Sequence, residues 1–396
     1  MNRKGLSVGL ILLLIGISII PITAQDTEKS KLALRGSWLY VGGSGPGNYT
    51  RIQDAIDDSS DGDTVFVYDA SSPYYENNIS INTSINLIGE DRNTTIIDEK
   101  GGGYGTTILQ IYADDVKVTG FTIADYNGVY SDTGIYIEGN VGKHNIIKTV
   151  SNVNISGNIF VNTATAIHET KTFHSIISGN IVYSTGFSEG SLINRGIDLS
   201  HALNSTIKGN TILYAGNTGI CTEFSHCLIE GNFISYVAQP MNQYGISQMY
   251  SSNRILGNTI TKVTIGIVSV SSFSIISQND ISYCDYYGLI FAKPSRFNII
   301  TKNNISECEH YGIALYQSLF TVVKENNFIK NNNSAFFIGS MGTRWIRNYW
   351  DDWNGTGPKR IPGLFVFPWE NWYYVEGRPY DNFDWHPAKE PYDIGV

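Results

Sequence analysis

A short motif built around an asparagine recurs along most of the chain, at intervals of 21 to 30 residues. Its copies read ISGNIF, ISGNIV, IKGNTI, IEGNFI, ILGNTI, ISQNDI, ITKNNI and VKENNF, with asparagines at Asn158, Asn180, Asn210, Asn232, Asn258, Asn279, Asn303 and Asn326. A second motif, glycine followed by isoleucine or leucine, runs in step with the first, with glycines at Gly134, Gly196, Gly219, Gly245, Gly266, Gly288 and Gly312. Self-similarity with a period of about 24 residues is typical of a solenoid, in which each unit buries its apolar side against the next.

The residues inside each period favour strands over helices. Short, alternating, β-branched runs are separated by Asn, Gly and Ser, and no run shows the 3.6-residue periodicity of a helical repeat. We therefore predict an all-β fold, a single-stranded right-handed parallel β-helix of about 10–12 rungs. Rungs about 4.8 Å apart would stack equivalent residues into ladders. The repeated asparagine is expected to adopt left-handed backbone at a turn and to hydrogen-bond to its counterparts in neighbouring coils.

The chain divides into four predicted segments. Residues 1–24 form a signal peptide, because Arg3 and Lys4 precede a long uncharged run; an uncleaved N-terminal anchor that tethers the chain to a membrane is the alternative. Residues 25–45 are a linker. Residues 46–340 form the β-helix, which opens with a short capping helix whose capping box is Thr50 and Gln53. Residues 341–396 hold six of the seven tryptophans and six of the eleven prolines, so this tail is expected to leave the coil and cap its end.

Net charge and sequons indicate which partner and which location to expect. The net charge is −9 and no basic cluster is visible, which argues against a nucleic-acid partner. Nine N-x-S/T sequons fit an extracellular or cell-surface location. Among the four cysteines, Cys284 and Cys308 each lie four residues before a repeat glycine, so they should stack one rung apart. A disulfide and a ladder of buried thiols are both compatible with that placement.

The outward face of the glycine motif contains the candidate catalytic residues. The isoleucine of the motif and the second residue after it are expected to point into the coil, so the residue between them points outward. The candidates are Glu138, His168, Asp198 and Glu223. Neighbouring rungs would place such groups about 5 to 10 Å apart, which covers both geometries of paired-carboxylate glycoside hydrolysis. A calcium ion serving lyase chemistry, or a merely solvated polar face, are the alternatives.

The same register raises three further expectations. Arg195 would either supply the base of a lyase or simply flank a turn. Glu169 and Gln248 point into the coil, which is costly unless they are paired. The second half of the outward face is apolar, with Val268 and Ile290 in the column, and the aromatic tail is expected to cover it.

Tyrosines on the same face offer a way to bind sugar without catalysis. Tyr286, Tyr287 and Tyr311 come just before their repeat glycines on adjacent rungs, and Tyr136 stands in the outward column. Exposed rings of this kind can stack on pyranose faces. We predict that these four tyrosines contact a polysaccharide or surface glycan.

Three longer stretches carry a family resemblance. The opening RIQDAIDDSSDGDTVFVY, the glycine and asparagine repeats, and the tail segments NYWDDWNGTGPK and DWHPAKEPYDI resemble secreted archaeal β-helix proteins of the NosD-like, carbohydrate-binding and sugar-hydrolysis group. The resemblance implies a pectin-lyase-like fold. It also implies one of three roles, because the group includes polysaccharide-active enzymes, structural surface proteins and copper-site maturation factors.

Copper is the least favoured of these roles. His174 and His226 share a register but lie two rungs apart, too far to bind one ion, and the sequence has no His-Met cluster. We therefore expect no metal cofactor apart from the calcium alternative. The expected function is carbohydrate binding with hydrolase or lyase activity, and the alternative is a non-catalytic structural or adhesive surface protein.

Overall fold

The computed structural model describes residues 36–99, 106–125, 133–139, 149–183, 195–235, 243–367 and 377–395. The chain divides into two compact units, 1–35 and 36–396, and the second is described here. The predicted signal or anchor segment, 1–24, and the beginning of the predicted linker lie outside the described residues. Within these residues, no helix has the length and apolar character needed to cross a membrane.

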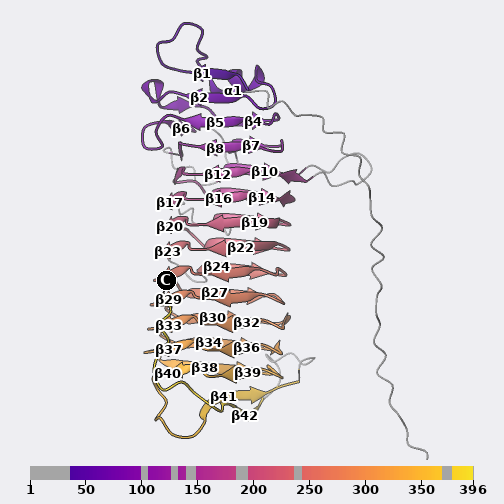
Figure 1. The fold of residues 1–396 in the computed structure, drawn as a ribbon, viewed down its shortest axis with the longest axis vertical. Coiled ribbons are helices and arrows are strands. Elements are labelled where there is room, and N and C mark those ends of the chain that lie inside the picture. The colour runs from indigo at the N-terminus through magenta and orange to yellow at the C-terminus, as the bar shows by residue number, and fades with distance from the viewer. Residues whose placement is uncertain are drawn as a thin grey trace, which may run out of the picture. The chain divides into compact units, whose positions relative to one another are not determined.

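The second unit is a parallel β-helix in which each coil adds one strand to each of three parallel arrays, called the first, second and third sheets (Figure 1). The first and second sheets are joined into one 28-stranded sheet by the pair of β41 and β42. The first sheet contains β4 (Ile79–Ile81), β7 (Thr107–Ile111), β10 (Thr133–Glu138), β14 (Thr165–Thr170), β18 (Arg195–Ser200), β21 (Thr218–Glu223), β24 (Tyr244–Met249), β27 (Ile265–Val270), β30 (Tyr287–Phe291), β34 (Tyr311–Tyr316), β38 (Asn333–Ile338) and β41 (Lys359–Phe365). The second sheet contains β1 (Trp38–Val41), β2 (Thr64–Val67), β5 (Asn86–Gly89), β8 (Lys117–Thr119), β12 (Asn154–Ser156), β16 (Ile176–Ser178), β19 (Leu203–Lys208), β22 (His226–Glu230), β25 (Arg254–Leu256), β28 (Ile275–Ser277), β32 (Ile299–Thr301), β36 (Val322–Lys324), β39 (Arg344–Ile346) and β42 (Arg378–Asp384).

The third sheet has 12 strands, which confirms the predicted number of rungs. Its strands are β3 (Tyr74–Tyr75), β6 (Ile96–Asp98), β9 (Thr122–Ala124), β13 (Ile159–Val161), β17 (Ile181–Tyr183), β20 (Thr211–Leu213), β23 (Phe233–Ser235), β26 (Thr259–Thr261), β29 (Asp280–Ser282), β33 (Asn304–Ser306), β37 (Asn327–Ile329) and β40 (Tyr349–Trp350). Short additional elements lie in the turns, namely η1 (Asp69–Ser71), β11 (Val150–Ser151), β15 (Thr172–Phe173), β31 (Ser295–Arg296) and β35 (Ser318–Leu319).

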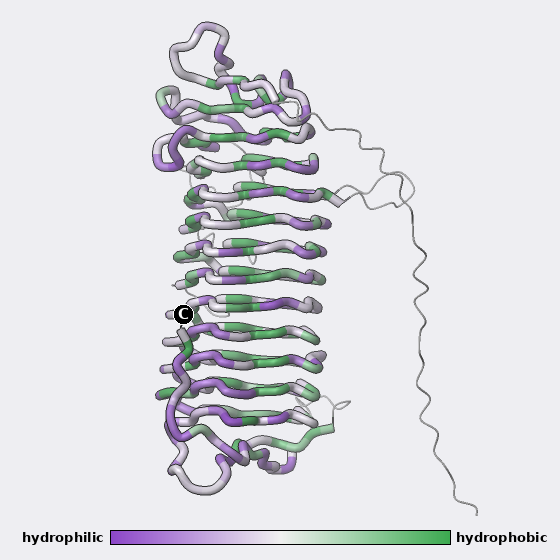
Figure 2. The backbone as a smooth tube through the Cα atoms, in the orientation of Figure 1, coloured by the Kyte–Doolittle hydropathy of each residue, from purple (hydrophilic) through white to green (hydrophobic). Residues whose placement is uncertain are grey.

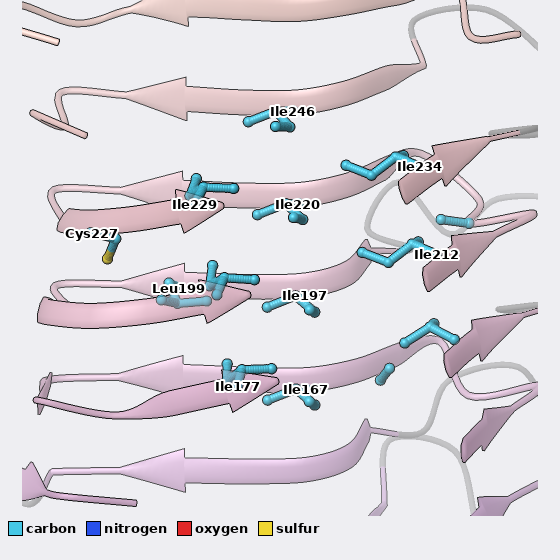
Figure 3. Close-up of a cluster of buried hydrophobic side chains, with 14 of the residues drawn as sticks. Ile167, Ile177, Ile197, Leu199, Ile212, Ile220, Cys227, Ile229, Ile234 and Ile246 are labelled. Carbon is cyan, nitrogen blue, oxygen red and sulfur yellow. The ribbon is translucent and has the colours of Figure 1, made fainter. Parts of the chain in front are cut away.

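Stacks of isoleucine fill the inside of the coil. Ile167, Ile197, Ile220 and Ile246 are partners in successive strands of the first sheet and are fully buried (Figure 3). Apolar residues recur in every coil of the stack, as Figure 2 shows. Each buried isoleucine contributes about 1.5–3 kcal/mol relative to an exposed one, so these stacks stabilise the β-helix strongly.

The repeated asparagines form one continuous hydrogen-bonded ladder, as predicted. Each side-chain Nδ2 donates to Oδ1 of the asparagine in the next coil at 2.9–3.3 Å. Each Oδ1 also accepts the backbone N–H of the preceding asparagine. The ladder includes a ninth member, Asn348, and all nine side chains are buried. Buried amides are tolerated here because both ends of each amide are paired.

The predicted left-handed conformation of these asparagines was wrong. The residue before each asparagine takes the positive φ instead. In five coils that residue is glycine, for example Gly209 at φ 59°. In the later coils it is a residue with a Cβ, for example Lys302 at φ 54°. Glycine adopts this region without steric cost, which explains why Gly-Asn is the commoner form of the motif.

The N-terminal end begins earlier than predicted and is capped differently. β1 lies inside the segment predicted as a linker and pairs with β2 in parallel. The helix α1 (Ile52–Asp57) buries its apolar stripe, but no capping box forms. Instead the carboxylate of Glu76 accepts the N–H of Ile52 at 2.6 Å and that of Gln53 at 3.2 Å. The Gln53 side chain bonds the backbone of Ser80 in β4, so α1 covers the open sheet edge.

The C-terminal boundary also differs from the prediction. β39 and β40 add one more rung after residue 340, because Trp345 and Trp350 take the inward positions of Val323 and Phe328 in the coil before. The tail then forms β41 and β42, which pair antiparallel with each other and in parallel with β38 and β39. The described part of the tail thus pairs with the last strands of the β-helix.

One carboxylate ends the asparagine ladder at this point. Asp384 is fully buried, and its Oδ2 accepts the backbone N–H of Asn348, the Asn348 side-chain amide and the Trp350 indole N–H. Its Oδ1 accepts the N–H groups of Arg347 and His386. A carboxylate fits this position because it only accepts hydrogen bonds. A further asparagine would bring N–H donors for which the end of the ladder has no acceptor.

The buried thiols resolve the cysteine alternatives. Cys284 and Cys308 are free and buried, so the structure has the thiol ladder and not the proposed disulfide. Their side chains leave equivalent positions of adjacent parallel rungs, an arrangement that does not turn the two Cβ vectors toward each other.

Candidate functional site

The predicted outward column of the first sheet has the register expected from the sequence. Tyr136, His168, Asp198 and Cys221 are partners in β10, β14, β18 and β21. The column continues through Ser247, Val268, Ile290 and Ala314. The register therefore follows the glycine motif, but the column is not uniformly exposed. Tyr136, His168, Val268 and Ile290 are half-buried, whereas the other four members, Asp198, Cys221, Ser247 and Ala314, are buried.

Two side chains of this column, His168 and Asp198, form a charged cluster with Arg195 of β18. Arg195 Nη1 lies 2.7 Å from Asp198 Oδ1, and His168 Nδ1 lies 3.2 Å from Asp198 Oδ2. The Asp198 side chain is 5% exposed, whereas those of Arg195 and His168 are 29% and 31% exposed. Burial raises the pKa of Asp198, but the hydrogen bond from His168 and the charge of Arg195 outweigh it, so the pKa is lowered overall. The cluster therefore presents one oriented imidazole and one oriented guanidinium around an ionised carboxylate.

An aromatic ring completes this side of the cluster. The Tyr136 ring lies 5.2 Å from the imidazole of His168, with the two planes at 51°. Burial and the neighbouring Glu138 carboxylate raise the pKa of Tyr136 to about 12, so the phenol is protonated at neutral pH. Tyr136 therefore offers a hydroxyl and an apolar ring beside the charged groups.

The structure brings together only part of the predicted catalytic set. His168 and Asp198 are in contact, but Glu138 and Glu223 lie in the second outward column, on coils three apart. Arg195 is the residue that the sequence reasoning left undecided. The strand pattern alone gives little signal for it, because residues three apart lie on opposite faces of a strand, and only the length of the guanidinium lets Arg195 reach Asp198.

The hydrogen-bond partners of Asp198 limit the part that it could take in a glycosidase pair. Asp198 is buried and already bonded to two partners, so it is neither a protonated acid nor a free nucleophile. Among the described residues, no group of three or more His, Cys, Asp or Glu side chains is placed to hold a metal ion. The cluster can orient the polar groups of a ligand.

The predicted tyrosine contacts lie further along the same sheet. Tyr287 and Tyr311 are register partners whose rings stack 6.1 Å apart, and Tyr286 stacks on His310 at 5.3 Å. Tyr287 occupies the strand position of Arg195, four strands later. At about 4.8 Å per rung, roughly 19 Å separates the two groups along the axis. Tyr286 is 51% exposed and is the most accessible member.

The apolar part of the outward face is not covered by the described tail. Val268 and Ile290 are half-buried, while the strand pairs of the tail involve only the last rungs. The prediction that the tail covers these two residues is therefore wrong for its described part. Trp369 and Trp372 lie outside the described residues.

The sequence reasoning missed an exposed aromatic ridge. It lies where the first sheet turns into the second, and its rings stack 5.0–5.4 Å apart in two runs. Its members are His201, Phe224, Tyr250, Phe273, Phe297 and Phe320. The rings of the ridge are stacked like those of the tyrosine group, so stacking alone does not distinguish the two as surfaces for a sugar.

The two inward polar residues of the first sheet are satisfied to different degrees. Gln248 donates to Ser269 and accepts from Asn253 and Ser274, so both polar atoms of its side chain are paired. Glu169 is fully buried and accepts one hydrogen bond, from Thr172 at 2.9 Å. Its other oxygen, Oε1, has no hydrogen-bond partner among the described residues.

A pH dependence of stability follows from Glu169. Burial raises its pKa to about 7, against an ordinary value of 4.5, and the hydrogen bond from Thr172 lowers it only in part. Because the folded state holds the proton more tightly, stability from Glu169 is full below pH 4.5 and falls as the pH rises to 7. The loss is on the order of 3 kcal/mol at 1.36 kcal/mol per pKa unit. Denaturant titrations between pH 4.5 and 8 are expected to show this loss in the wild type and not in Glu169→Gln. The exposed Glu309→Gln should retain the wild-type slope, and a slope retained by Glu169→Gln would contradict the assignment.

Comparisons with known proteins agree on the fold. Residues 195–349 match the family model described as a right handed beta helix region. A cell surface glycoprotein of Methanothermus fervidus is 27% identical over 250 residues, which is 60% of this chain and 39% of that protein. The match therefore spans about two fifths of the glycoprotein. The family match and the strand topology together show that this chain is a right-handed parallel β-helix.

Solved structures of low identity share this fold. The A-module of mannuronan C-5 epimerase AlgE6 from Azotobacter vinelandii has a TM-score of 0.55 at 14% identity, covering 75% of this chain and 87% of that one. DFA-IIIase from Arthrobacter chlorophenolicus A6, in complex with DFA-III, has a TM-score of 0.56 at 12% identity, covering 78% of this chain and 94% of that one. PfbA, a surface adhesin of Streptococcus pneumoniae, has a TM-score of 0.53 at 13% identity, covering 86% of this chain and 95% of that one.

Proposed function

We propose that this right-handed β-helix is a cell-surface protein that binds a neutral polysaccharide along the outward face of its first sheet. The observation that carries the proposal is the cluster of Arg195, Asp198 and His168 beside the Tyr136 ring. Strands hold these groups in fixed orientations, and fixed polar groups next to an aromatic ring suit both the hydroxyls and the apolar face of a pyranose.

Charge decides between classes of polysaccharide. Asp198 and Arg195 neutralise each other, which leaves Glu138 and Glu223 as half-buried carboxylates on the same face. An acidic polysaccharide would meet these charges and be repelled. A neutral polysaccharide can use the same carboxylates as hydrogen-bond acceptors for its hydroxyls.

The tyrosine group gives the face a second contact region. Tyr286, Tyr287 and Tyr311 lie on the sheet that carries the charged cluster, roughly 19 Å away along the axis. A chain that ran parallel to the axis would meet both regions. A linear polysaccharide therefore suits the face better than a single sugar does.

The related proteins support a surface location and a connection with carbohydrate. The Methanothermus relative is a cell surface glycoprotein, and PfbA is a surface adhesin. The AlgE6 module belongs to a mannuronan epimerase, and the DFA-IIIase structure contains DFA-III. We propose binding and not hydrolysis or elimination, because both carboxylate oxygens of Asp198 already contact His168 and Arg195. Cleavage of the polysaccharide is measured as a second readout of the test.

Affinity gel electrophoresis tests the proposal directly. The chain from Gln25 onward is run through gels that contain neutral or acidic polysaccharides, and migration is compared with that in plain gel. We expect a neutral polysaccharide to retard the wild type. Asp198→Asn removes the charge that orients Arg195 and His168 at nearly constant size, and a loss of affinity of about 10-fold, or 1.4 kcal/mol, is expected. Arg254→Ala, which removes an exposed arginine from the second sheet, is the matched control and should bind like the wild type.

Two outcomes would count against the proposal. Equal retardation of the wild type and Asp198→Asn would mean that the cluster takes no part in binding. Absence of retardation by every neutral polysaccharide would favour the non-catalytic structural or adhesive surface protein. Reducing ends measured in the same mixtures decide whether bound polysaccharide is also cleaved.

A further inference from the structure

A pocket lies at the C-terminal end of the β-helix, away from the charged cluster of the first sheet. It is a pocket of about 480 Å³ between β39 and β42, a volume in the range of small-ligand sites. Residues 343–347 line one side and residues 382–386 the other. Trp345 of β39 and Asp384 of β42 are register partners, so the two strands run side by side beneath the pocket.

The lining of the pocket is cationic in an acidic protein. Arg344, Arg347 and His386 are exposed residues of the lining, whereas the whole chain carries a net charge of −9. Among the ion pairs of the described residues, none includes any of these three. The carboxylate of the lining, Asp384, is fully buried and accepts five hydrogen bonds at the end of the asparagine ladder. Its lone pairs are therefore not available to the two arginines.

An aromatic wall stands beside these cations. Trp385 is 66% exposed, and its ring lies 5.4 Å from that of Phe383. A tryptophan this exposed does not contribute to the core, and a flat apolar surface next to guanidinium groups suits a ligand that joins an anion to a ring. Arginine favours carboxylate and sulfate in particular, because its donors match two oxygens at once.

We propose that this pocket binds an acidic sugar, with Arg344 and Arg347 on its oxyanion and Trp385 against its ring. The shared chemistry is an oxyanion carried on a pyranose, either the carboxylate of a uronic acid or a sulfate ester. The site does not depend on the proposed binding face, which is on other coils and favours neutral sugars. The two sites together would let one β-helix contact two kinds of surface glycan.

Titration of the full chain from Gln25 with defined oligosaccharides tests this site. The ligands are a uronate oligosaccharide, a sulfated oligosaccharide and a neutral oligosaccharide of equal length, and the readouts are calorimetry and tryptophan fluorescence. We expect the uronate or the sulfated ligand to bind and to change the fluorescence. The double variant Arg344→Gln/Arg347→Gln is expected to lose at least 10-fold in affinity, and Trp385→Ala to lose affinity and the fluorescence change.

Matched variants separate this site from the binding face. The double variant Arg254→Gln/Arg296→Gln removes two exposed arginines elsewhere and should bind like the wild type. Asp198→Asn should also leave acidic-sugar binding unchanged, so failure of one proposal is distinguishable from failure of the other. Equal losses in both arginine pairs would show a general charge effect and overturn the site. Free acetate or sulfate binding as tightly as the oligosaccharide would overturn the role of Trp385.

Discussion

Replacing Asn258 with alanine is expected to lower the free energy of unfolding of the surrounding coils by about 3–5 kcal/mol. The Asn258 side chain accepts two hydrogen bonds, from the backbone N–H and the side-chain amide of Asn232. It donates to the Oδ1 of Asn279 and to the carbonyls of Ile229 and Leu256. The substitution therefore leaves buried groups of three coils without a partner, where water cannot replace the lost bonds.

Hydrogen exchange of the Asn232 amide is the measurement for this variant. That N–H bonds Asn258 Oδ1 at 3.0 Å, so it is expected to lose its protection in Asn258→Ala. Asn332→Ala is the matched control, since Asn332 is exposed and its loss should change stability by less than about 0.5 kcal/mol. A small effect of Asn258→Ala, similar to that of Asn332→Ala, would mean that the ladder does not stabilise the coil.

Removing the carboxylate at the end of the ladder is expected to release the tail. Asp384 accepts five hydrogen bonds, and those from Asn348 and the Trp350 indole come from buried groups. Asp384→Ala is expected to cost about 3–5 kcal/mol in the last coil, since several of these donors lose their partner together. The main coil should remain folded, because coils contact chiefly their neighbours.

Limited proteolysis reads out this second variant. Asp384→Ala is expected to be cut after β40 far faster than the wild type, leaving a resistant core. Asp384→Asn keeps one acceptor but introduces an unpaired donor, so it should fall between the two. If Asp384→Ala and the wild type were cut at the same rate, the tail would be held by β41 and β42 packing alone.

The repeat predicted the coil well because each repeat position has a single physical role. The glycine motif fixed which residues point inward, and the partners His168 and Asp198 were found through that register alone. The asparagine ladder also followed from the spacing, since parallel rungs stack equivalent residues. These features depend on local periodicity, which a single sequence contains in full.

Features that depend on long side chains or on distant segments were missed. Glu76 caps α1 from 24 residues beyond Ile52, and a capping box considers only residues within one turn, so the local sequence could not predict it. Arg195 joins the site only because its guanidinium reaches Asp198, which a backbone register does not reveal. Trp345 and Trp350 extend the coil into a segment whose proline content indicated a tail. The aromatic ridge escaped notice because its two runs occupy different turn positions.

Hydroxyl-radical footprinting of the polysaccharide complex tests the central claim most directly. The full chain from Gln25 is oxidised with and without saturating neutral polysaccharide, and modification of each aromatic residue is quantified by mass spectrometry. Binding along the first sheet should protect Tyr136, His168 and Tyr286 while leaving the exposed ridge residues Phe273 and Phe297 unchanged. Protection of the ridge with no change at Tyr136 and His168 would place the polysaccharide on another face and contradict the account.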